Sequence, residues 1–474
     1  MVIDTESLLQ ALPTKRWFGA KGRALDRIEV LDEVTIDDGP PQLLLALVVV
    51  HLEAEPHQIY QVLVHVHEDG SQTDALDDPD RLTVIGELMA RGSTFHGSSG
   101  DFHFGGPGLD PLAPPGSFAS VLDAEQSNSS LVLDDDVIVK LFRRIEVGPN
   151  PDLELNRLLT NEGFERVPPQ VGEVLYEGIL HGEEVEIDLG IAQQFIADGI
   201  DGWQQILVDL QRLYDEADDT DDDADEDDLL EAVEARAPTS LEAMVELGDV
   251  TASLHVVLSR EELEFEMLAE PIDNQDLKEW AERARHMLSQ LTDGGPGELA
   301  ALEDAVQECI DHLRSIEDAG QKIRIHGDYH LGQVMLSPRG WMILDLEGEP
   351  ARSLEDRRTK QSPLRDVAGM LRSFSYAVWA SLFDRTKPES QEWLRLQRWG
   401  LAWERLARDR FITAYMRTSH EGTFLPPDRE DLKVMLDVFE IDKALYELNY
   451  ERGHRPQWIR IPLRGIAQVI DRVG

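Results

Sequence analysis

The feature that most constrains the fold of this chain is a change of pattern near residue 200. Before that point, short apolar runs alternate with turn residues, as in successive strands, and from Asp201 onward most of the chain has a helical pattern. A strand-rich part followed by a helical part predicts an α+β fold. With 474 residues, the chain is longer than a usual single domain, so two or three domains are expected.

Residues 1 to about 90 predict a β-rich region. Strands are expected at Val34–Ile36, Gln42–Glu53 and His57–Glu68, with turns between them. The run Leu43–Val50 (LLLALVVV) is too short to cross a bilayer and indicates a buried strand. Because the N-terminus also lacks the pattern of a signal peptide, we expect a soluble, cytoplasmic protein.

The middle of the chain predicts a connection followed by further strands. Gly92–Gly108 and Pro111–Gly116 are expected to form a connecting segment or flexible loops. A helix is expected to begin near Pro151-Asp152, where both residue types suit a first turn. The strands expected around this helix are Ser130–Leu133, Val137–Phe142, Gly172–Leu180 and Glu183–Phe195.

The charge of the chain excludes some classes of partner. There are 93 acidic and 44 basic residues, for a formal net charge of −49. Such an anion repels nucleic-acid phosphates and anionic membranes, so neither is an expected partner. Because the charge is spread along the chain, we interpret it as adaptation to high salt. The single cysteine, Cys309, excludes a disulfide framework and suits a reducing compartment.

One acidic block is much denser than the rest. Between Asp215 and Asp228, eleven of fourteen residues are acidic, which is typical of a solvated, mobile loop. The block lacks the glycine at the sharp turn of an EF-hand, so a calcium site is not favoured.

The segment that carries the chemistry runs from Ile325 to Pro350 (IHGDYHLGQVMLSPRGWMILDLEGEP). Two apolar pieces flank Ser337–Gly340, as in a β-hairpin. A hairpin returns its chain, so residues before its first strand and after its second strand lie side by side. The polar residues expected to converge there are Asp328, Gln333, Asp345 and Glu347.

This arrangement suits phosphoryl transfer. One carboxylate must accept the proton of the attacking hydroxyl, while other oxygen-bearing side chains hold Mg²⁺. The spacing resembles that of kinase-like phosphotransferases, the class that includes aminoglycoside and choline kinases. The resemblance implies that Asp328 is the catalytic base, that Asp345 binds Mg²⁺, and that Gln333 replaces the usual metal-binding Asn. His326 is expected to brace the loop, whereas His330 could brace or react. The alternative is an acidic loop on a surface hairpin.

A kinase-like fold also needs residues that bind ATP. Lys140 ends a predicted strand and Glu154 lies on the helix after it, so the resemblance implies a phosphate-binding lysine and its ion-pair partner. The alternative is a surface pair. The chain lacks GxGxxG and GxxxxGK[ST], but small residues before this strand suit a phosphate-binding loop. The loop candidates are Ser127, Asn128 and Ser129, and the adenine-hinge candidates are Gln194, Phe195 and Ile196.

Longer motifs resemble the bacterial maltokinases, which make maltose 1-phosphate from maltose and ATP. They are LPTKRWFGAKGR from Leu12, EQSNSS, IVKLFRR, NPDLE, Asp201-Gly202-Trp203, LGDVTASLH, HGDYHLGQV, DLEGEPARSLEDRRTKQSPLRDVAGMLRS and DKALYELNYERGHRPQWIRIPL from Asp442. The resemblance implies a two-lobed, protein-kinase-like fold with a cap at 1–90, an intermediate region and N-lobe at 91–195, and a helical C-lobe at 196–474. It also implies ATP and Mg²⁺ as cofactors, and a role in α-glucan or trehalose metabolism.

A sugar site is expected near the C-terminus. Lys443, Tyr446, Glu447 and Tyr450 fall at three- and four-residue spacings, so they share a helix face, and Trp458 follows. Charged groups bind sugar hydroxyls and aromatic rings pack on apolar sugar faces. An amphipathic helix that packs its tyrosines inward explains the spacing equally well. The resemblance favours contact of these residues with maltose. His330 is also expected among the substrate residues.

Three alternatives stay open. A glucosamine or other aminosugar kinase of the same fold is the nearest, and an aminoglycoside kinase would not need the cap. From another class, the chain could be a binding subunit associated with a trehalose–maltose-converting enzyme. Retention of Lys140, Asp328, Gln333 and Asp345 together argues against an inactive subunit.

Overall fold

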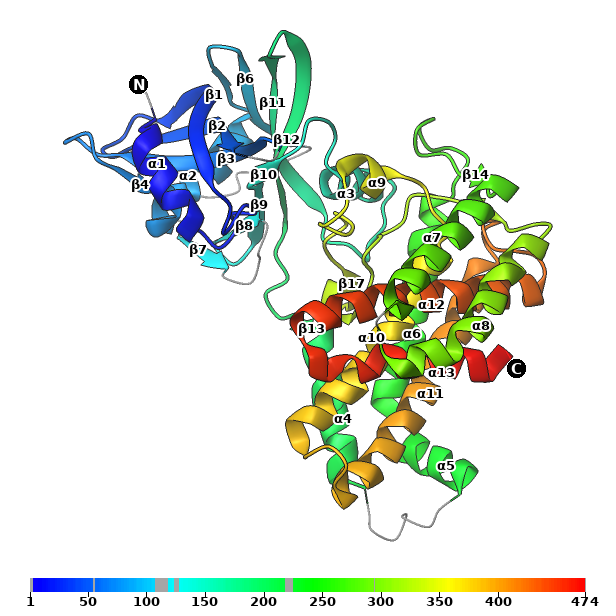
Figure 1. The fold of residues 1–474 in the computed structure, drawn as a ribbon. Coiled ribbons are helices and arrows are strands. Elements are labelled where there is room, and N and C mark those ends of the chain that lie inside the picture. Colours follow the sequence, from blue (N-terminus) through cyan, green and yellow to red (C-terminus); the bar gives the residue numbers. More distant parts are fainter. Residues whose placement is uncertain are drawn as a thin grey trace. The chain divides into compact units, whose positions relative to one another are not determined.

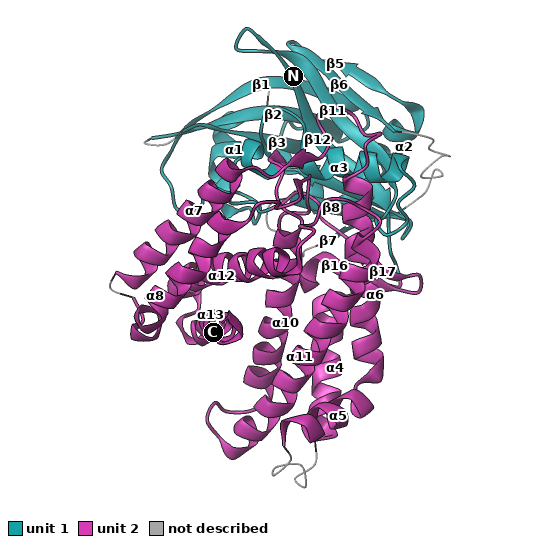
Figure 2. Cartoon of the chain, turned by 90° about the vertical axis from the view of Figure 1, so that its right-hand side faces the viewer, with its two compact units in different colours: residues 1–197, 349–357 teal, residues 198–348, 358–474 magenta. Residues whose placement is uncertain are grey.

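The computed structural model describes residues 3–53, 56–106, 118–122, 128–217, 225–293 and 295–473. The chain divides into two compact units, drawn in different colours in Figure 2. Unit 1 comprises residues 1–197 and 349–357, and unit 2 comprises 198–348 and 358–474. Most strands belong to the first unit and most helices to the second (Figure 1), so the predicted α+β class is confirmed.

The first sheet of unit 1 is antiparallel, in the order β1-β2-β3-β10, with β4 also paired to β3. Its strands are β1 (Leu25–Asp37), β2 (Gln42–Leu52), β3 (Gln58–Val66), β4 (Gln72–Asp74) and β10 (Arg144–Ile145). Helix α1 (Thr5–Ala11) and the 3₁₀ turn η1 (Leu12–Thr14) precede it. The three strands predicted before residue 90 are confirmed, and β1 is longer than predicted.

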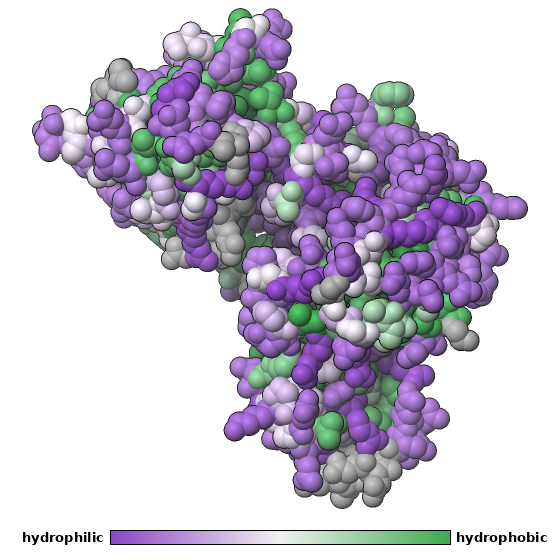
Figure 3. Space-filling view, in the orientation of Figure 1, coloured by the Kyte–Doolittle hydropathy of each residue, from purple (hydrophilic) through white to green (hydrophobic). Residues whose placement is uncertain are grey.

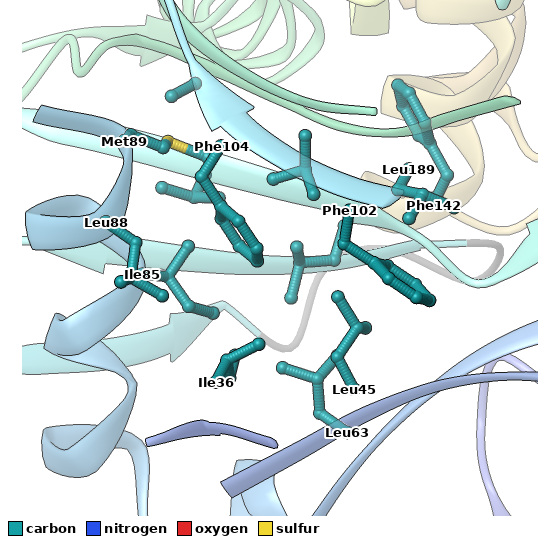
Figure 4. Close-up of a cluster of buried hydrophobic side chains, with 14 of the residues drawn as sticks. Ile36, Leu45, Leu63, Ile85, Leu88, Met89, Phe102, Phe104, Phe142 and Leu189 are labelled. Atoms are coloured by element: carbon teal, nitrogen blue, oxygen red, sulfur yellow. The ribbon is translucent and has the colours of Figure 1, made fainter. Parts of the chain in front are cut away.

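Strand β2 is buried on both faces, which explains its continuous apolar run. Leu43, Leu45 and Leu47 pack in a core with residues of the second sheet, seen in part in Figure 4. The alternating positions, including Leu44 and Val48, pack in another core with the segment around α1. Because successive side chains of a strand point to opposite faces, both faces of the sheet must be covered by apolar side chains.

The second sheet of unit 1 has seven strands in the order β5-β6-β11-β12-β9-β8-β7. These are β5 (Thr94–His96), β6 (Gly100–Gly105), β7 (Ala119–Leu122), β8 (Asn128–Leu133), β9 (Val137–Phe142), β11 (Gln170–Leu180) and β12 (Glu183–Gln194). Helices α2 (Thr83–Arg91) and α3 (Pro151–Asn161) complete the unit. The strands predicted between residues 130 and 195 and the helix at Pro151 are confirmed.

One prediction for this region was wrong. Part of the glycine-rich stretch Gly92–Gly108, expected to be a connection or flexible loops, forms strands β5 and β6. Glycine is needed where β6 meets β11, because a Cβ on Gly100 would lie 2.4 Å from the carbonyl oxygen of Glu177. Here glycine permits close strand approach. The stretch Pro111–Gly116 lies outside the described residues.

Unit 2 is mainly helical, and α10 is buried along most of its length. Its helices are α4 (Gly202–Asp215), α5 (Glu226–Arg236), α6 (Pro238–Leu258), α7 (Asn274–Thr292), α8 (Gly297–Asp311), α10 (Leu364–Arg385), α11 (Gln391–Ser419), α12 (Arg429–His454) and α13 (Arg460–Val473). The short helix α9 (Leu354–Arg358) belongs to unit 1 except for its last residue. Two small sheets contain β13 (Ile200–Asp201), β16 (Val334–Ser337) and β17 (Gly340–Ile343), and β14 (Glu270–Pro271) and β15 (Gln321–Lys322). The predicted hairpin around Ser337–Gly340 is confirmed.

The acidic block from Asp215 to Asp228 is not entirely a loop. Asp225 caps the N-terminus of α5 by accepting a hydrogen bond from the Asp228 N–H, and the first turn of that helix is acidic. Acidic side chains are favoured there because helix N-termini carry partial positive charge. Residues 218–224 of the block lie outside the described residues.

The surface agrees with the composition. Hydrophilic residues cover most of the face seen in Figure 3, as expected for a chain in which 29% of the residues are charged. None of the helices that the structure describes combines the length and apolar character needed to cross a membrane.

Candidate active site

The loop that carries the predicted base is held by a buried carboxylate on α10. Asp366, 2% exposed, accepts hydrogen bonds from the His326 N–H (2.8 Å) and the Gly327 N–H (3.0 Å). His255 Nε2 lies 3.2 Å from the same carboxylate, and its Nδ1 lies 2.9 Å from the Tyr415 hydroxyl. Both backbone donors and a buried ring therefore fix the loop to the helical core.

The loop also bonds to the hairpin. His326 Nδ1 accepts from the Asp328 N–H (3.4 Å), so its Nε2–H donates to the Leu344 carbonyl (2.9 Å). Both ring nitrogens are therefore hydrogen-bonded, which fits the predicted bracing role of His326. Gly327 has a φ of +83°, a left-handed conformation that glycine adopts without strain.

Asp328 lies beside two nitrogen-bearing side chains. Lys443 Nζ on α12 is 3.2 Å from Oδ1, and His330 Nε2 is 3.8 Å from Oδ2. Burial favours the protonated carboxyl, but the positive charge and the hydrogen bond of Lys443 hold the pKa of Asp328 below its usual value. Asp328 is therefore ionised at neutral pH, as a proton acceptor must be.

His330 is fixed in one tautomer. Its Nδ1 accepts a hydrogen bond from the Gly332 N–H (3.0 Å), so the proton of the neutral ring lies on Nε2, the nitrogen nearer Asp328. Burial lowers the pKa of His330, Asp328 opposes the change and Lys443 adds to it. A neutral ring that carries an N–H can donate a hydrogen bond to an acceptor placed near Asp328.

The hairpin β16–β17 brings Gln333 and Asp345 together, as its geometry predicts. Gln333 Nε2 lies 3.1 Å from Asp345 Oδ2, and the Leu344 N–H donates to the Gln333 carbonyl. Asp345 has a φ of +58°, a conformation that few residues other than glycine adopt and that places its side chain just beyond the strand. Glu347, two residues on, is 7% exposed.

These residues fit the chemistry of a magnesium site. Mg²⁺ takes oxygen ligands and is usually held by one or two carboxylates together with substrate phosphates and water. Asp345 supplies a carboxylate, and Gln333, after rotation of its amide, supplies an oxygen beside it. Within the described ranges, no group of three or more His, Cys, Asp or Glu side chains is placed to hold a metal ion. The metal roles of Gln333, Asp345 and Glu347 stay predictions.

In unit 1, the predicted phosphate lysine has a carboxylate partner that the sequence did not indicate. Lys140 on β9 is buried, and its Nζ lies 3.1 Å from Asp152 Oδ2 on the first turn of α3. Asp152 is itself 1% exposed and accepts from Asn156 Nδ2 (2.9 Å). The prediction named Glu154 on the same helix as the partner, and that role stays a prediction.

The other nucleotide candidates also lie in unit 1. Asn128 and Ser129 begin β8, where Ser129 Oγ accepts from Arg143 Nε (2.8 Å), and Ser127 lies outside the described residues. The Gln194 N–H donates to Pro169 and the Phe195 N–H to Asp136. Both donors are thus occupied, so an adenine edge would have to use other main-chain groups of the predicted hinge, such as those of Ile196.

All six predicted substrate residues line one pocket of unit 2, with a volume of about 350 Å³. Its walls come from α4, the loop before η6 (Leu331–Gln333), α10, α12 and η7 (Pro456–Trp458). The predicted members are His330, Lys443, Tyr446, Glu447, Tyr450 and Trp458. The pocket reaches the predicted base, because His330 and Lys443 line the pocket and also lie beside Asp328. Their role as substrate ligands is a proposal.

The two glutamates of the pocket are held by arginines. Glu447 Oε2 accepts from Nε (3.0 Å) and Nη2 (2.8 Å) of Arg372, which is 2% exposed. Glu451 forms a bidentate pair with Arg455 (2.7 and 2.9 Å) and accepts from the Tyr376 hydroxyl (3.2 Å). Burial, with Glu447 adding to it, raises the pKa of Tyr376 above its usual value. The carboxylates are therefore fixed in position and their charge is balanced.

Some lining residues were not predicted individually. The unpredicted aromatic and charged members are Trp203, Tyr376, Glu451 and Arg455. Glu451 lies in the last turn of α12 and Arg455 directly follows the helix, four residues on, a spacing that could have indicated an ion pair. Trp203 and Tyr376 come from α4 and α10, and only the packing of these helices brings them to the pocket.

Comparison with known proteins finds a family match in each of two parts of the chain. Residues 12–94 match the maltokinase N-terminal cap domain, and residues 203–407 match the phosphotransferase enzyme family. A glucosamine kinase of Mycolicibacterium smegmatis is 24% identical over 360 residues, which cover 74% of this chain and 79% of that protein. A glucosamine kinase of Streptacidiphilus jiangxiensis is 25% identical over 350 residues, which cover 71% and 70%.

Solved structures of glucosamine kinase share the fold. One, in complex with glucosamine, ADP and inorganic phosphate, superposes with a TM-score of 0.68 at 19% identity over 97% of this chain and 96% of that one. A second crystal form gives a TM-score of 0.69. The chain therefore has the kinase-like fold of the phosphotransferase enzyme family. Its residues 203–407 match the phosphotransferase enzyme family, and its residues 12–94 match a maltokinase-type N-terminal cap.

The role of Asp366 leads to a first prediction. Asp366→Asn should lower kcat at least about tenfold, because an amide cannot accept from both backbone N–H groups and the loop moves. The free energy of unfolding should fall by about 2–4 kcal/mol. Steady-state kinetics and denaturant titration measure the two effects. Asp384→Asn, at the exposed end of the same helix, is the control, and unchanged kcat in Asp366→Asn would exclude the proposed anchoring.

The Lys443–Asp328 pair leads to a second prediction. In Lys443→Met, loss of the cation should raise the pKa of Asp328, so the acid limb of the pH profile of kcat should move to higher pH. The measurement is a full pH–rate profile, which gives the pH of the acid limb independently of the maximal kcat. Lys433→Met on the same helix should leave the limb in place, and an unshifted limb in Lys443→Met would contradict the assignment.

Proposed function

We propose that this protein is an ATP-dependent sugar kinase, that maltose is its acceptor, and that its products are maltose 1-phosphate and ADP. The observation that carries the proposal is that two residues of the aromatic pocket also lie beside the predicted base. His330 and Lys443 contact Asp328 and also line the aromatic pocket. An acceptor in that pocket would therefore present a hydroxyl beside a carboxylate that is ionised at neutral pH.

The pocket suits a carbohydrate. Aromatic rings pack against the apolar faces of sugars, and charged groups bind their hydroxyls. Tyr446, Tyr450 and Trp458 supply rings, and the glutamates supply acceptors whose positions are fixed by arginines. Because Arg372 holds only Oε2 of Glu447, the other carboxylate oxygen is available to a sugar hydroxyl.

The charge balance favours a neutral sugar over an aminosugar. Glucosamine carries a cationic amine near neutral pH and would be favoured by a carboxylate without a cation beside it. In this pocket Glu447 is paired with Arg372, and Glu451 with Arg455, and Lys443 adds a further cation near Asp328. The maltokinase-type cap and the C-terminal motif support the same acceptor.

In the proposed reaction, a small number of residues have separate roles. The acceptor hydroxyl attacks the γ-phosphorus of ATP as its proton passes to Asp328, and ADP leaves. Lys140, held by Asp152, would bind phosphates. Gln333 and Asp345 would hold Mg²⁺, with Glu347 nearby, and the bound metal would offset the negative charge of the phosphates. The neutral Nε2–H tautomer of His330 would orient the hydroxyl toward Asp328.

A second candidate function is a glucosamine kinase. It is favoured by the names of the two relatives, which match more than two thirds of this chain. Sequence identity of 24–25% leaves room for a change of acceptor within one fold. The acceptor pocket, rather than the catalytic loop, therefore decides between the two.

An acceptor panel tests the proposal. With ATP, Mg²⁺ and molar KCl, kcat/KM for maltose should exceed that for glucose, glucosamine and kanamycin by at least about tenfold. Coupled measurement of ADP gives the rates, and phosphorus NMR locates the phosphate at C1. A preference for glucosamine would discard maltose and keep the kinase, whereas no turnover with any sugar, in protein shown to be folded, would favour the binding-subunit alternative.

A further inference from the structure

Asp188 on β12 is a buried carboxylate to which the proposed reaction assigns no role. It is 9% exposed, and its Oδ2 accepts a hydrogen bond from the Asn150 N–H at 2.6 Å. Asn150 is the N-cap residue of α3. Two residues earlier, the Gly148 N–H donates to the Glu186 carbonyl, also on β12 (3.2 Å). Strand β12 therefore holds the loop that enters α3 at two points.

The same loop leads directly to the carboxylate beside the predicted phosphate lysine. Asn150 Oδ1 accepts from the Asp152 N–H (2.9 Å), and Asp152 Oδ2 accepts from Lys140 Nζ (3.1 Å). A continuous series of hydrogen-bonded residues thus runs from Asp188 through the helix cap to Lys140. All of these residues lie in unit 1. A shift of the cap would move Asp152, which lies only two residues further along the chain.

Strand β12 also reaches Asp152 from the other side. Asn156 Nδ2 donates to Asp152 Oδ1 (2.9 Å), and Gln193 Nε2 of β12 donates to Asn156 Oδ1 (3.0 Å). Two side chains of one strand are therefore connected to the same carboxylate, one through the cap of α3 and one through its second turn. Gln193 is uncharged, so Asp188 is the connection that depends on pH.

The charge state of Asp188 is set by its surroundings. Burial raises its pKa to about 6, against the opposing effect of the Asn150 N–H. Arg157 of α3 also favours the ionised form, whereas Glu186 of β12 and Glu173 of β11 oppose it. Asp188 is therefore mostly ionised above neutral pH and loses its charge in mild acid. An ionised acceptor forms the stronger hydrogen bond, so acid weakens the hold on the cap.

We propose that Asp188 is a positioning residue for nucleotide binding, because its carboxylate fixes the cap of α3 and so keeps Asp152 in place against Lys140. This inference rests on the proposed ATP-dependent reaction, in which Lys140 binds the phosphates. Asp188 acts through Asn150 and Asp152 rather than on the nucleotide itself. The affinity for nucleotide should therefore depend on the charge of Asp188.

The test is calorimetric binding of Mg–ADP to the full chain and to Asp188→Asn, which keeps an acceptor but removes the charge. At about pH 7.5 the variant should bind at least about threefold more weakly. Near pH 5 the two chains should bind alike, because Asp188 is then uncharged in both. Protonation of the nucleotide cancels in this ratio. Glu184→Gln, an exposed change on the same strand, is the control and should bind as the unaltered chain does.

Thermal unfolding of the same chains separates positioning from a structural role. A carboxyl group whose pKa is raised by burial lowers the stability of the folded state once it ionises, so its removal does not destabilise the chain at neutral pH. Asp188→Asn should therefore unfold at the temperature of the unaltered chain or above it, although it binds Mg–ADP more weakly. An affinity ratio that does not change with pH, or a joint loss of affinity and stability, would overturn the proposal.

A double-mutant cycle tests whether Asp188 acts through Lys140. Asp188→Ala removes the acceptor and should weaken Mg–ADP binding at least about tenfold. In a folded Lys140→Met chain, the same change should have little further effect, whereas additive losses would contradict the proposed path. If the unaltered chain binds no Mg–ADP, the proposed function and this inference both fail. If it binds and the Asp188 variants bind equally well, this inference alone fails.

Discussion

The candidate active site depends on the two oxygens of one buried carboxylate. Asp366 receives two consecutive backbone N–H groups of the catalytic loop and the ring of His255. Backbone donors buried without acceptors would be costly, so the loop has one favourable path through the core. Position in the first turn of α10 also favours the negative charge, because helix N-termini carry partial positive charge. The placement of Asp328 follows from this anchor.

From that anchor, the geometry extends in two directions within unit 2. Along the chain, His326 ties the loop to the hairpin that carries Gln333 and Asp345. Across the fold, Lys443 of α12 reaches Asp328 and lines the aromatic pocket. The predicted base, the two predicted oxygen ligands and the aromatic pocket are thus connected by direct contacts, so the proposed function uses all of them.

Local patterns predicted much of this, and tertiary contacts supplied the rest. The hairpin required that Gln333 and Asp345 meet, and helical spacing placed Lys443, Tyr446 and Glu447 on one face of α12. Spacing could not show that Arg372 of α10 lies behind Glu447, or that Asp152 is the carboxylate on Lys140. Glycines misled the prediction at β6, because the same residue type serves in loops and in close strand contacts.

The central claim is that Asp328 accepts the proton of a sugar hydroxyl. The most direct measurement is rapid-quench turnover of Asp328→Asn with ATP, Mg²⁺ and maltose, combined with calorimetric binding of each substrate. The account predicts binding close to that of the unaltered chain and a loss of about 10²–10⁴ in the rate of phosphoryl transfer. Near-normal transfer in this variant would contradict the account, because the loop, its anchor and the pocket would then be arranged around a carboxylate that the reaction does not use.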